Sequence, residues 1–196
     1  VEYYNSAPNA AAGTRQIEFK VTDSEGGTSP AANVGINFVP ENDAPVMQVV
    51  TTPVEWIRQT VNLQPTLNLT DKDHVQLANA TVTIVQGQGF VPSIDSLTAT
   101  KTAGVHDQIQ VTYDAGRGEL LLSGPGSPAA YQSLLRTVNL VQTDAAATTN
   151  ATKRMTRLIQ FEVKDLAGAS TGVFERRYYN SDLIFKPTIS SISTVG

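Results

Sequence analysis

The sequence has no cysteine, two histidines and one tryptophan among its 196 residues. Without cysteine the chain has no disulfides, no thiolate metal ligands and no cysteine nucleophile. This absence does not assign a compartment, because a β-sandwich that buries a sufficient core needs no disulfides. No apolar run approaches the roughly 18 residues that a membrane-spanning helix needs.

Charged residues are scarce as well, at 16% of the sequence with a net charge of -4. Lys and Arg form no cluster, and phosphate binding depends on clustered cations, so the composition argues against nucleic acid as a partner. Thr, Ala, Ser, Gln, Asn and Gly fill the positions that Lys and Glu occupy in most helical proteins. The composition therefore favours an all-β chain.

Motifs that support catalysis are also missing from the sequence. It contains no G-x-S-x-G elbow, no H-E-x-x-H helix and no glycine-rich phosphate loop. His74 and His106 both fall in predicted loops, where solvated surface histidines are expected. We expect no enzyme activity from these residues.

An internal repeat organises the chain. Residues 15–29, RQIEFKVTDSEGGTS, match residues 157–171, RLIQFEVKDLAGAST, at a constant offset of 142 residues. Each copy alternates apolar and polar residues and then enters an acidic, glycine-containing turn, which is typical of a half-buried strand followed by a loop. The sequence therefore predicts a tandem-repeat protein.

The repeat sets the expected domain boundaries. Residues 1–43 are expected to be the C-terminal part of one β-sandwich repeat, residues 44–185 a complete repeat, and residues 186–196 the start of a following repeat or linker. Two prolines in PENDAP, residues 40–45, predict a short, stiff joint. A partial sandwich exposes its core face, so either the polypeptide extends upstream, which we favour, or another chain adds the missing strands.

The expected fold is all-β, an Ig-like or cadherin-like β-sandwich with one short helix near residues 128–136. Ser127 can cap this helix, Pro128 suits its first position, and Tyr131, Leu134 and Leu135 have the spacing of one apolar face. Eight strands suit a two-sheet sandwich. They are expected at residues 46–50, 60–69, 80–86, 108–113, 119–123, 137–142, 157–164 and 173–179.

Four segments together carry a family resemblance: NDAPV at the joint, then LNLTDKDHVQLANATVTI, GELLLSGPGSPAAYQSLLRTVNLV and RLIQFEVKDLAGAS. In this order and spacing they resemble the cadherin-like or immunoglobulin-like tandem repeats of giant surface adhesins and extracellular matrix proteins, including chondroitin-sulfate-proteoglycan-type repeats. The resemblance implies sandwiches joined head to tail in long extracellular rods, without enzymatic activity.

Calcium at the joint is the first candidate site. Ca²⁺ takes six to eight oxygen ligands, and linkers of the cadherin type place Asn and Asp between domains. The alternative is a polar turn at residues 71–73 and an Asx-turn before the proline. The following joint, at residues 183–186, has no carboxylate, so calcium at both joints is not expected. The candidate ligands are Asp23, Glu41, Asn42, Asp43, Asp71 and Asp73.

Glycosylation is the second candidate modification. Asn68, Asn79 and Asn150 each begin an Asn-x-Thr sequon, although chance predicts nearly as many in a chain this rich in Ser and Thr. Trp56 is expected in the core or at the joint, and the alternative is a platform on which a sugar stacks.

The function expected from these features is that of a structural or adhesive, rod-forming module, extracellular or at the cell surface. Its expected partners are neighbouring repeats of the same chain and like subunits in a fibre. The main alternative is a ligand- or carbohydrate-binding module, which would need a pocket rich in aromatic residues, and the sequence does not bring Trp56 and Tyr113 together. A hydrolase with sandwich appendages would need a catalytic domain elsewhere.

Overall fold

A computed structural model describes residues 2–6, 11–56, 60–73, 76–143 and 156–180. These residues form thirteen strands and one helix. The elements are β1 (Gly13–Phe19), β2 (Ala32–Phe38), β3 (Val46–Gln48), β4 (Val54–Trp56), β5 (Thr60–Asn62), β6 (Asn68–Thr70), β7 (Leu77–Ile84), β8 (Asp95–Thr98), β9 (Gln110–Asp114), β10 (Glu119–Gly126), α1 (Pro128–Leu135), β11 (Asn139–Gln142), β12 (Arg157–Asp165) and β13 (Phe174–Asn180).

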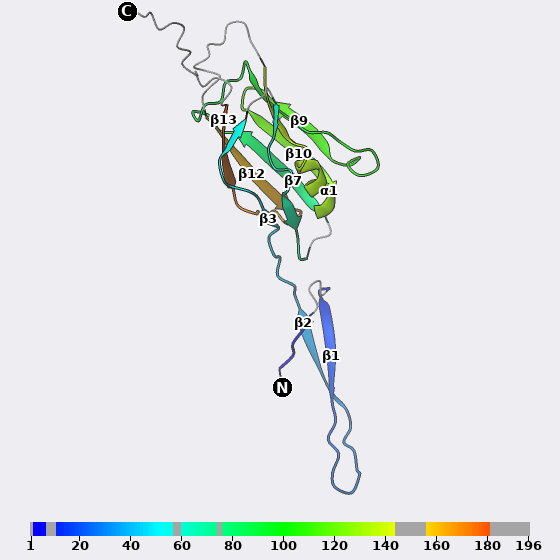
Figure 1. The fold of residues 1–196 in the computed structure, drawn as a ribbon. Coiled ribbons are helices and arrows are strands. Elements are labelled where there is room, and N and C mark those ends of the chain that lie inside the picture. Colours follow the sequence, from blue (N-terminus) through cyan, green and yellow to red (C-terminus); the bar gives the residue numbers. More distant parts are fainter. Residues whose placement is uncertain (1, 7–10, 57–59, 74–75, 144–155, 181–196) are drawn as a thin grey trace, which may run out of the picture.

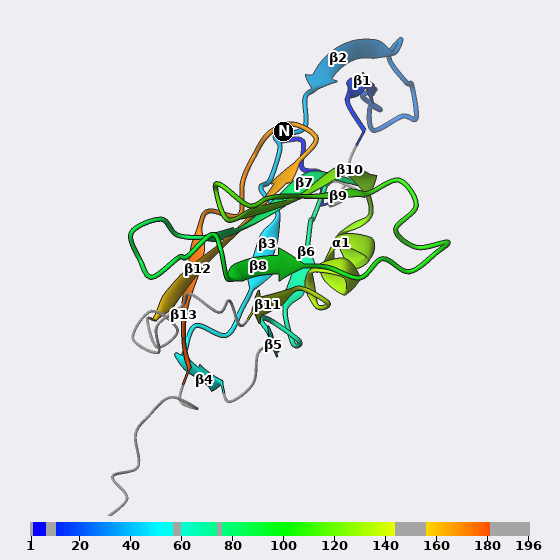
Figure 2. The same cartoon turned by 90° about the horizontal axis from the view of Figure 1, so that it is seen from above.

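The strands form a hairpin and a β-sandwich. β1 and β2 pair only with each other among the described residues, and they extend away from the sandwich (Figure 1). The main sheet of the sandwich has the order β4-β13-β12-β7-β10-β9. The second layer contains the β5-β11-β8 sheet and the β3-β6 pair, with α1 beside β6 (Figure 2). The predicted all-β sandwich with one short helix is confirmed.

Alternating burial along most of β7, β10 and β12, the three central strands of the main sheet, produces the core. Phe161 of β12 and Leu120 of β10 both lie opposite Val82 of β7, and all three side chains are buried. Neighbouring inward positions repeat this pattern in rows across the sheet. Because side chains alternate between the two faces of a strand, the polar residues between them face outward.

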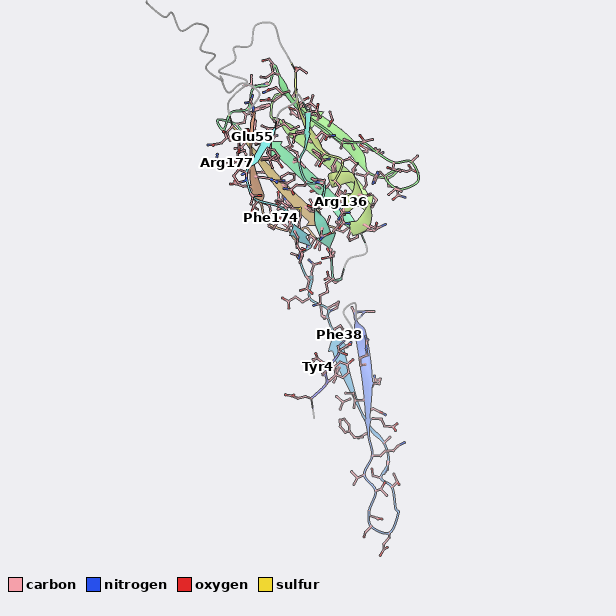
Figure 3. The ribbon with its side chains drawn as sticks, in the orientation of Figure 1. Tyr4, Phe38, Glu55, Arg136, Phe174 and Arg177 are labelled. Atoms are coloured by element: carbon pink, nitrogen blue, oxygen red, sulfur yellow. The ribbon has the colours of Figure 1, made fainter. Side chains whose placement is uncertain are left out.

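The helix α1 covers one edge of the core as its sequence predicts. The Ser127 side chain accepts a hydrogen bond from the Ala130 N–H at 3.1 Å, and the apolar face, including Tyr131 and Leu134, is buried. Arg136, labelled in Figure 3, ends the helix and donates from Nε to the Leu67 carbonyl at 2.7 Å. The helix is thereby fixed to the segment that leads into β6.

Apart from shifts of up to three residues at strand ends, the strands differ from the expectation in three ways. Residues 60–69 form two strands, because Leu67 closes a turn onto the Gln64 carbonyl and the Gln64 side chain bonds both backbone groups of Val50. β4 and β8 were not expected. β4 is a three-residue edge strand parallel to β13, and β8 carries the polar run DSLT. Residues 1–4, VEYY, have a sequence that predicts a short strand, and the described residues 2–4 form none.

One ion pair is buried between the two layers. Arg157 points inward from β12 and its Nε donates to Asp95 Oδ2 at 2.9 Å, with both side chains 0% exposed. The Val91 N–H donates to the same carboxylate oxygen at 2.8 Å. A buried charge that loses its partner is strongly destabilising, so this pair constrains how β8 sits against β12.

Two buried tyrosines and one half-buried tyrosine predict that stability falls in alkaline solution. Burial, the main cause in each case, raises the pKa of Tyr113, Tyr131 and Tyr178 to about 12, from a reference value of 10.0. Between about pH 10 and 12 the unfolded chain has lost protons that the folded protein still holds, so the free energy of unfolding decreases with pH. Urea unfolding at pH 9, 10.5 and 12 measures this dependence.

The matched variants for this test are Tyr131→Phe and Tyr4→Phe. Tyr131 donates its hydroxyl hydrogen toward the carbonyls of Ala78 and Gly124, whereas Tyr4 is 86% exposed. Tyr131→Phe should lower stability by about 1 kcal/mol at pH 7 and weaken the alkaline dependence. An equal effect of Tyr4→Phe would contradict this explanation.

Candidate functional site at the joint

The joint between hairpin and sandwich is held by side chains of the sandwich. Asn42 Nδ2 donates to Asp165 Oδ2 at 2.9 Å, and the Asp43 N–H donates to Asp73 Oδ2 at 2.8 Å. Lys72 Nζ bonds Asp43 Oδ2 at 2.8 Å, and this hydrogen bond is the main cause of the raised pKa of Lys72. The linker is therefore bonded to two separate turns at one end of the sandwich.

Each of these turns is ordered by its own aspartate. Asp165 ends β12, is 1% exposed, and accepts the Ala169 N–H on Oδ1 at 2.9 Å while Oδ2 receives Asn42. Asp71 Oδ1 accepts the Asp73 N–H at 3.2 Å, which is the polar turn considered as the alternative to calcium. The carboxylates are thus already engaged in hydrogen bonds within the chain.

Of the six predicted calcium ligands, Asp43 and Asp73 are brought together by a hydrogen bond, with Asn42 next to Asp43 in the linker and Asp71 in the adjoining turn. Lys72 supplies a positive charge there. Asn42 directs its amide NH₂ toward Asp165, so its oxygen does not face that carboxylate. Within the described ranges no three His, Asp or Glu side chains form a group that could hold a metal ion.

Asp23 does not reach this cluster. Its Oδ1 accepts the N–H of Gly27 at 2.8 Å and of Glu25 at 3.0 Å, within the turn that joins β1 to β2. That turn lies at the end of the hairpin remote from the joint (Figure 1), because β2 runs back along its full length before entering the linker. Glu41 is exposed in the linker. The linker is bonded instead by the carboxylates of Asp73 and of Asp165, which is the counterpart of Asp23 in the repeat.

The β1–β2 and β12–β13 hairpins have the same strand register. Arg15 lies opposite Ile36 and Phe19 opposite Ala32, while Arg157 lies opposite Tyr178 and Phe161 opposite Phe174. All eight positions correspond at the offset of 142 residues found in the sequence. The match therefore includes the returning strand, where the two sequences have little in common.

The turns of the two hairpins also share their hydrogen bonds. The Asp23 N–H donates to the Gly27 carbonyl at 2.9 Å, and the Asp165 N–H donates to the Ala169 carbonyl at 3.0 Å. Gly26 and Gly168 both have positive φ, at 87° and 90°, which glycine adopts readily. The two hairpins are thus built alike.

Burial is where the two hairpins differ. Phe161 and Val163 are 1% and 0% exposed, whereas their counterparts Phe19 and Val21 are 40% and 72% exposed. We call this row the inner face of the β1–β2 hairpin. It consists of Arg15, Ile17, Phe19, Val21, Val34 and Ile36. Figure 3 shows Phe38 on this hairpin, away from the sandwich in which Phe174 lies.

His106 is buried, and the expectation of a solvated surface histidine is wrong for this residue. It is 1% exposed, its Nδ1 accepts the Thr102 N–H at 2.8 Å, and its Nε2 lies 2.8 Å from Ser133 Oγ. An Nδ1 that accepts a hydrogen bond leaves the proton on Nε2, so the ring donates to Ser133 and is not placed to act as its base. His74 lies outside the described residues.

The sequons differ in exposure. Asn68 is exposed, and its Oδ1 accepts from Arg136 Nη2 at 3.0 Å. Asn79 is half-buried in the central strand β7, between Ser123 and Lys164 on the neighbouring strands. Asn150 lies outside the described residues. Of the two that are described, Asn68 is the more accessible acceptor.

Of the two aromatic residues considered for ligand binding, only the Tyr113 side chain is among those described, and it packs inward. Tyr113 is half-buried against the core and donates to the Asp95 carbonyl at 3.2 Å. Trp56 ends β4, and its side chain lies outside the described residues. A hollow of about 290 Å³ beside the start of α1 is lined by residues such as Val105, Gln108 and Ser127, with no aromatic side chain.

Comparisons with known proteins give distant similarity to solved structures alone. No family model matches the chain, and no curated protein matches it. Among solved structures the chain is similar to the crystal structure of the Protocadherin GammaB4 extracellular domain, with 11% identity and a TM-score of 0.32. The similarity covers 85% of this chain and 20% of that chain. At this TM-score it supports no argument, and the fold class rests on the strands themselves.

None of the helices in the described part of the chain is both long and apolar enough to span a bilayer.

The joint predicts a specific effect of Asn42→Ala. Losing the hydrogen bond to the buried Asp165 carboxylate should lower the unfolding free energy of the sandwich by about 1–3 kcal/mol. Urea unfolding at pH 7 measures the change. Asn37→Ala, an exposed change on β2, serves as the matched control, and equal losses in both variants would show that the joint does not support the sandwich.

Proposed function

We propose that this chain is a structural, rod-forming module of a long extracellular repeat protein, such as a surface fibre, matrix component or adhesin, and that it is not an enzyme. The observation that carries this proposal is the match of two hairpins in register, turn hydrogen bonds and inner-face residues at one constant offset. A second hairpin of the same kind on the other side of a proline-fixed joint is what sandwich units in series would produce.

The course of the chain through the sandwich supports a rod. The linker is bonded at the Asp165 end of the main sheet, where β12 finishes. β13 is antiparallel to β12, so it runs away from that end and carries the chain to the opposite one. When the chain enters each sandwich at one end and leaves it at the opposite end, successive sandwiches are arranged end to end.

The joint favours load transfer along such a rod. The linker is held by backbone and side-chain hydrogen bonds to two turns, and Pro40 and Pro45 restrict its conformations. The linker enters the sandwich through two buried residues, Pro45 and Met47. We expect bending between units to be limited by these contacts.

The faces of the sandwich suit contacts with like subunits. The outer face of the main sheet carries half-buried polar residues, among them Thr81, Thr83 and Gln160. Such a surface can bond laterally through polar groups without the large apolar patch of an obligate interface. An extracellular location would also admit a glycan at Asn68.

The size of the natural polypeptide tests this proposal. We expect a mass many times the 20.9 kDa of this chain, measured by mass spectrometry of the protein from its natural source before and after deglycosylation. A large mass follows from an array, and a loss of mass on deglycosylation follows from secretion. A natural mass near that of this chain would contradict the rod.

Calcium at the joint is tested separately. An ion that binds the folded protein alone must raise the melting temperature, by an amount set by its concentration over its dissociation constant. If Asp43 and Asp73 bind calcium, the melt should rise with millimolar CaCl₂, fall with chelator, and lose this response in Asp73→Asn. An identical melt with calcium and with chelator would remove calcium from the proposal and leave the rod intact.

A further inference from the structure

The inner face of the β1–β2 hairpin has the composition of a core face. Arg15, Ile17 and Phe19 of β1, and Val21 just after it, match their counterparts in β12 in residue type. The β12 residues are all buried, while Phe19, Val21 and Val34 are 40%, 72% and 50% exposed. Exposed apolar residues gathered in one row indicate a surface that packs against a partner.

The backbone of β1 has an open edge as well. β12 pairs with β13 on one side and with β7 on the other, whereas β1 pairs with β2 alone among the described residues. An open strand edge accepts another strand through its free N–H and C=O groups. A partner that provides a β7-like strand would satisfy the edge and cover the inner face together.

Arg15 specifies the chemistry of that partner. Its counterpart Arg157 is fully buried against the Asp95 carboxylate, in the same row as the apolar residues. Arg15 instead donates from Nη2 to the Ala11 carbonyl at 2.8 Å and lies over the Phe38 ring, with 5.7 Å to the centroid. Covering the inner face would bury this guanidinium, and a buried guanidinium requires a carboxylate.

We infer that the β1–β2 hairpin closes a preceding sandwich unit of the same polypeptide, and that Arg15 forms a buried ion pair with an acidic residue of that unit. The cover of β12 comes from strands that precede it in the chain, so an equivalent unit has its cover ahead of β1. Asp95 lies 62 residues before Arg157, which places the acid about 62 residues before Arg15. This inference rests on the tandem array proposed above.

The test uses the natural polypeptide extended upstream by about one repeat. Arg15→Lys should lower the melting temperature of the preceding unit by about 10 °C, because Lys cannot reproduce the guanidinium geometry in a buried pair. Arg157→Lys should lower the melt of the described sandwich by a similar amount. Arg117→Lys is the exposed control, since the Arg117 side chain is 71% exposed in its ion pair with Glu119.

The outcomes separate this inference from the rod itself. If Arg15→Lys leaves the melting temperature unchanged while Arg157→Lys lowers it, the ion pair proposed for Arg15 is wrong. This conclusion holds even if the natural mass shows an array. An upstream unit without an acid near the expected position would overturn it too. The 196-residue chain is also compared with the extended polypeptide for dimers that Phe19→Ser disrupts. If both form such dimers, a second copy covers the inner face of the β1–β2 hairpin and the inference is wrong.

A transplant tests whether the side chains of β1 fit a sandwich of this design. Residues 15–29 replace residues 157–171 in the full chain, residue for residue, which keeps β13 and the inward row. We expect the transplant to unfold in one cooperative transition, with a melting temperature within about 5 °C of that of the parent chain. Asp95→Asn should lower the melting temperature of the transplant and of the parent equally. If the transplant no longer unfolds cooperatively while Asp95→Asn destabilises the parent, the side chains of β1 do not fit a sandwich of this design.

Discussion

The antiparallel pairing of β12 with β7 is the contact on which the sandwich depends. It places Ile159, Phe161 and Val163 opposite the buried residues of β7 and makes the last hairpin part of the main sheet. Strand register has a period of two, so a shift of one residue would turn this row toward solvent and carry Arg157 away from Asp95. The core and the buried ion pair are thus fixed by one ladder of backbone hydrogen bonds.

The same hairpin also prepares the joint. Asp165 ends β12 by bonding its own turn through one carboxylate oxygen and receives Asn42 through the other. Folding of the last hairpin and anchoring of the linker are therefore coupled, since both use a single buried side chain. Asp23, the counterpart of Asp165 in the repeat, bonds its own turn at the far end of the β1–β2 hairpin.

Buried polar groups in this protein serve packing. His106, Ser133 and Thr102 form a chain of hydrogen bonds that ties the loop before β9 to α1, and the direction of donation leaves no base beside the hydroxyl. The hydroxyls of Tyr131 and Tyr178 likewise donate hydrogen bonds to backbone carbonyls. Each of these polar side chains satisfies a buried group that would otherwise be costly.

The sequence by itself determined the parts whose signals are local. Alternation and the 142-residue offset defined the last hairpin and its counterpart, and the Ser-Pro cap with its apolar spacing defined α1. Tertiary structure decided the rest. β4 is too short for a pattern and β8 too polar for one, and both are strands because neighbouring strands bond them. Whether Asp23 or Asp165 meets the linker, and whether His106 and Arg157 are buried, depends on which residues distant in sequence come into contact, and local periodicity contains no such information.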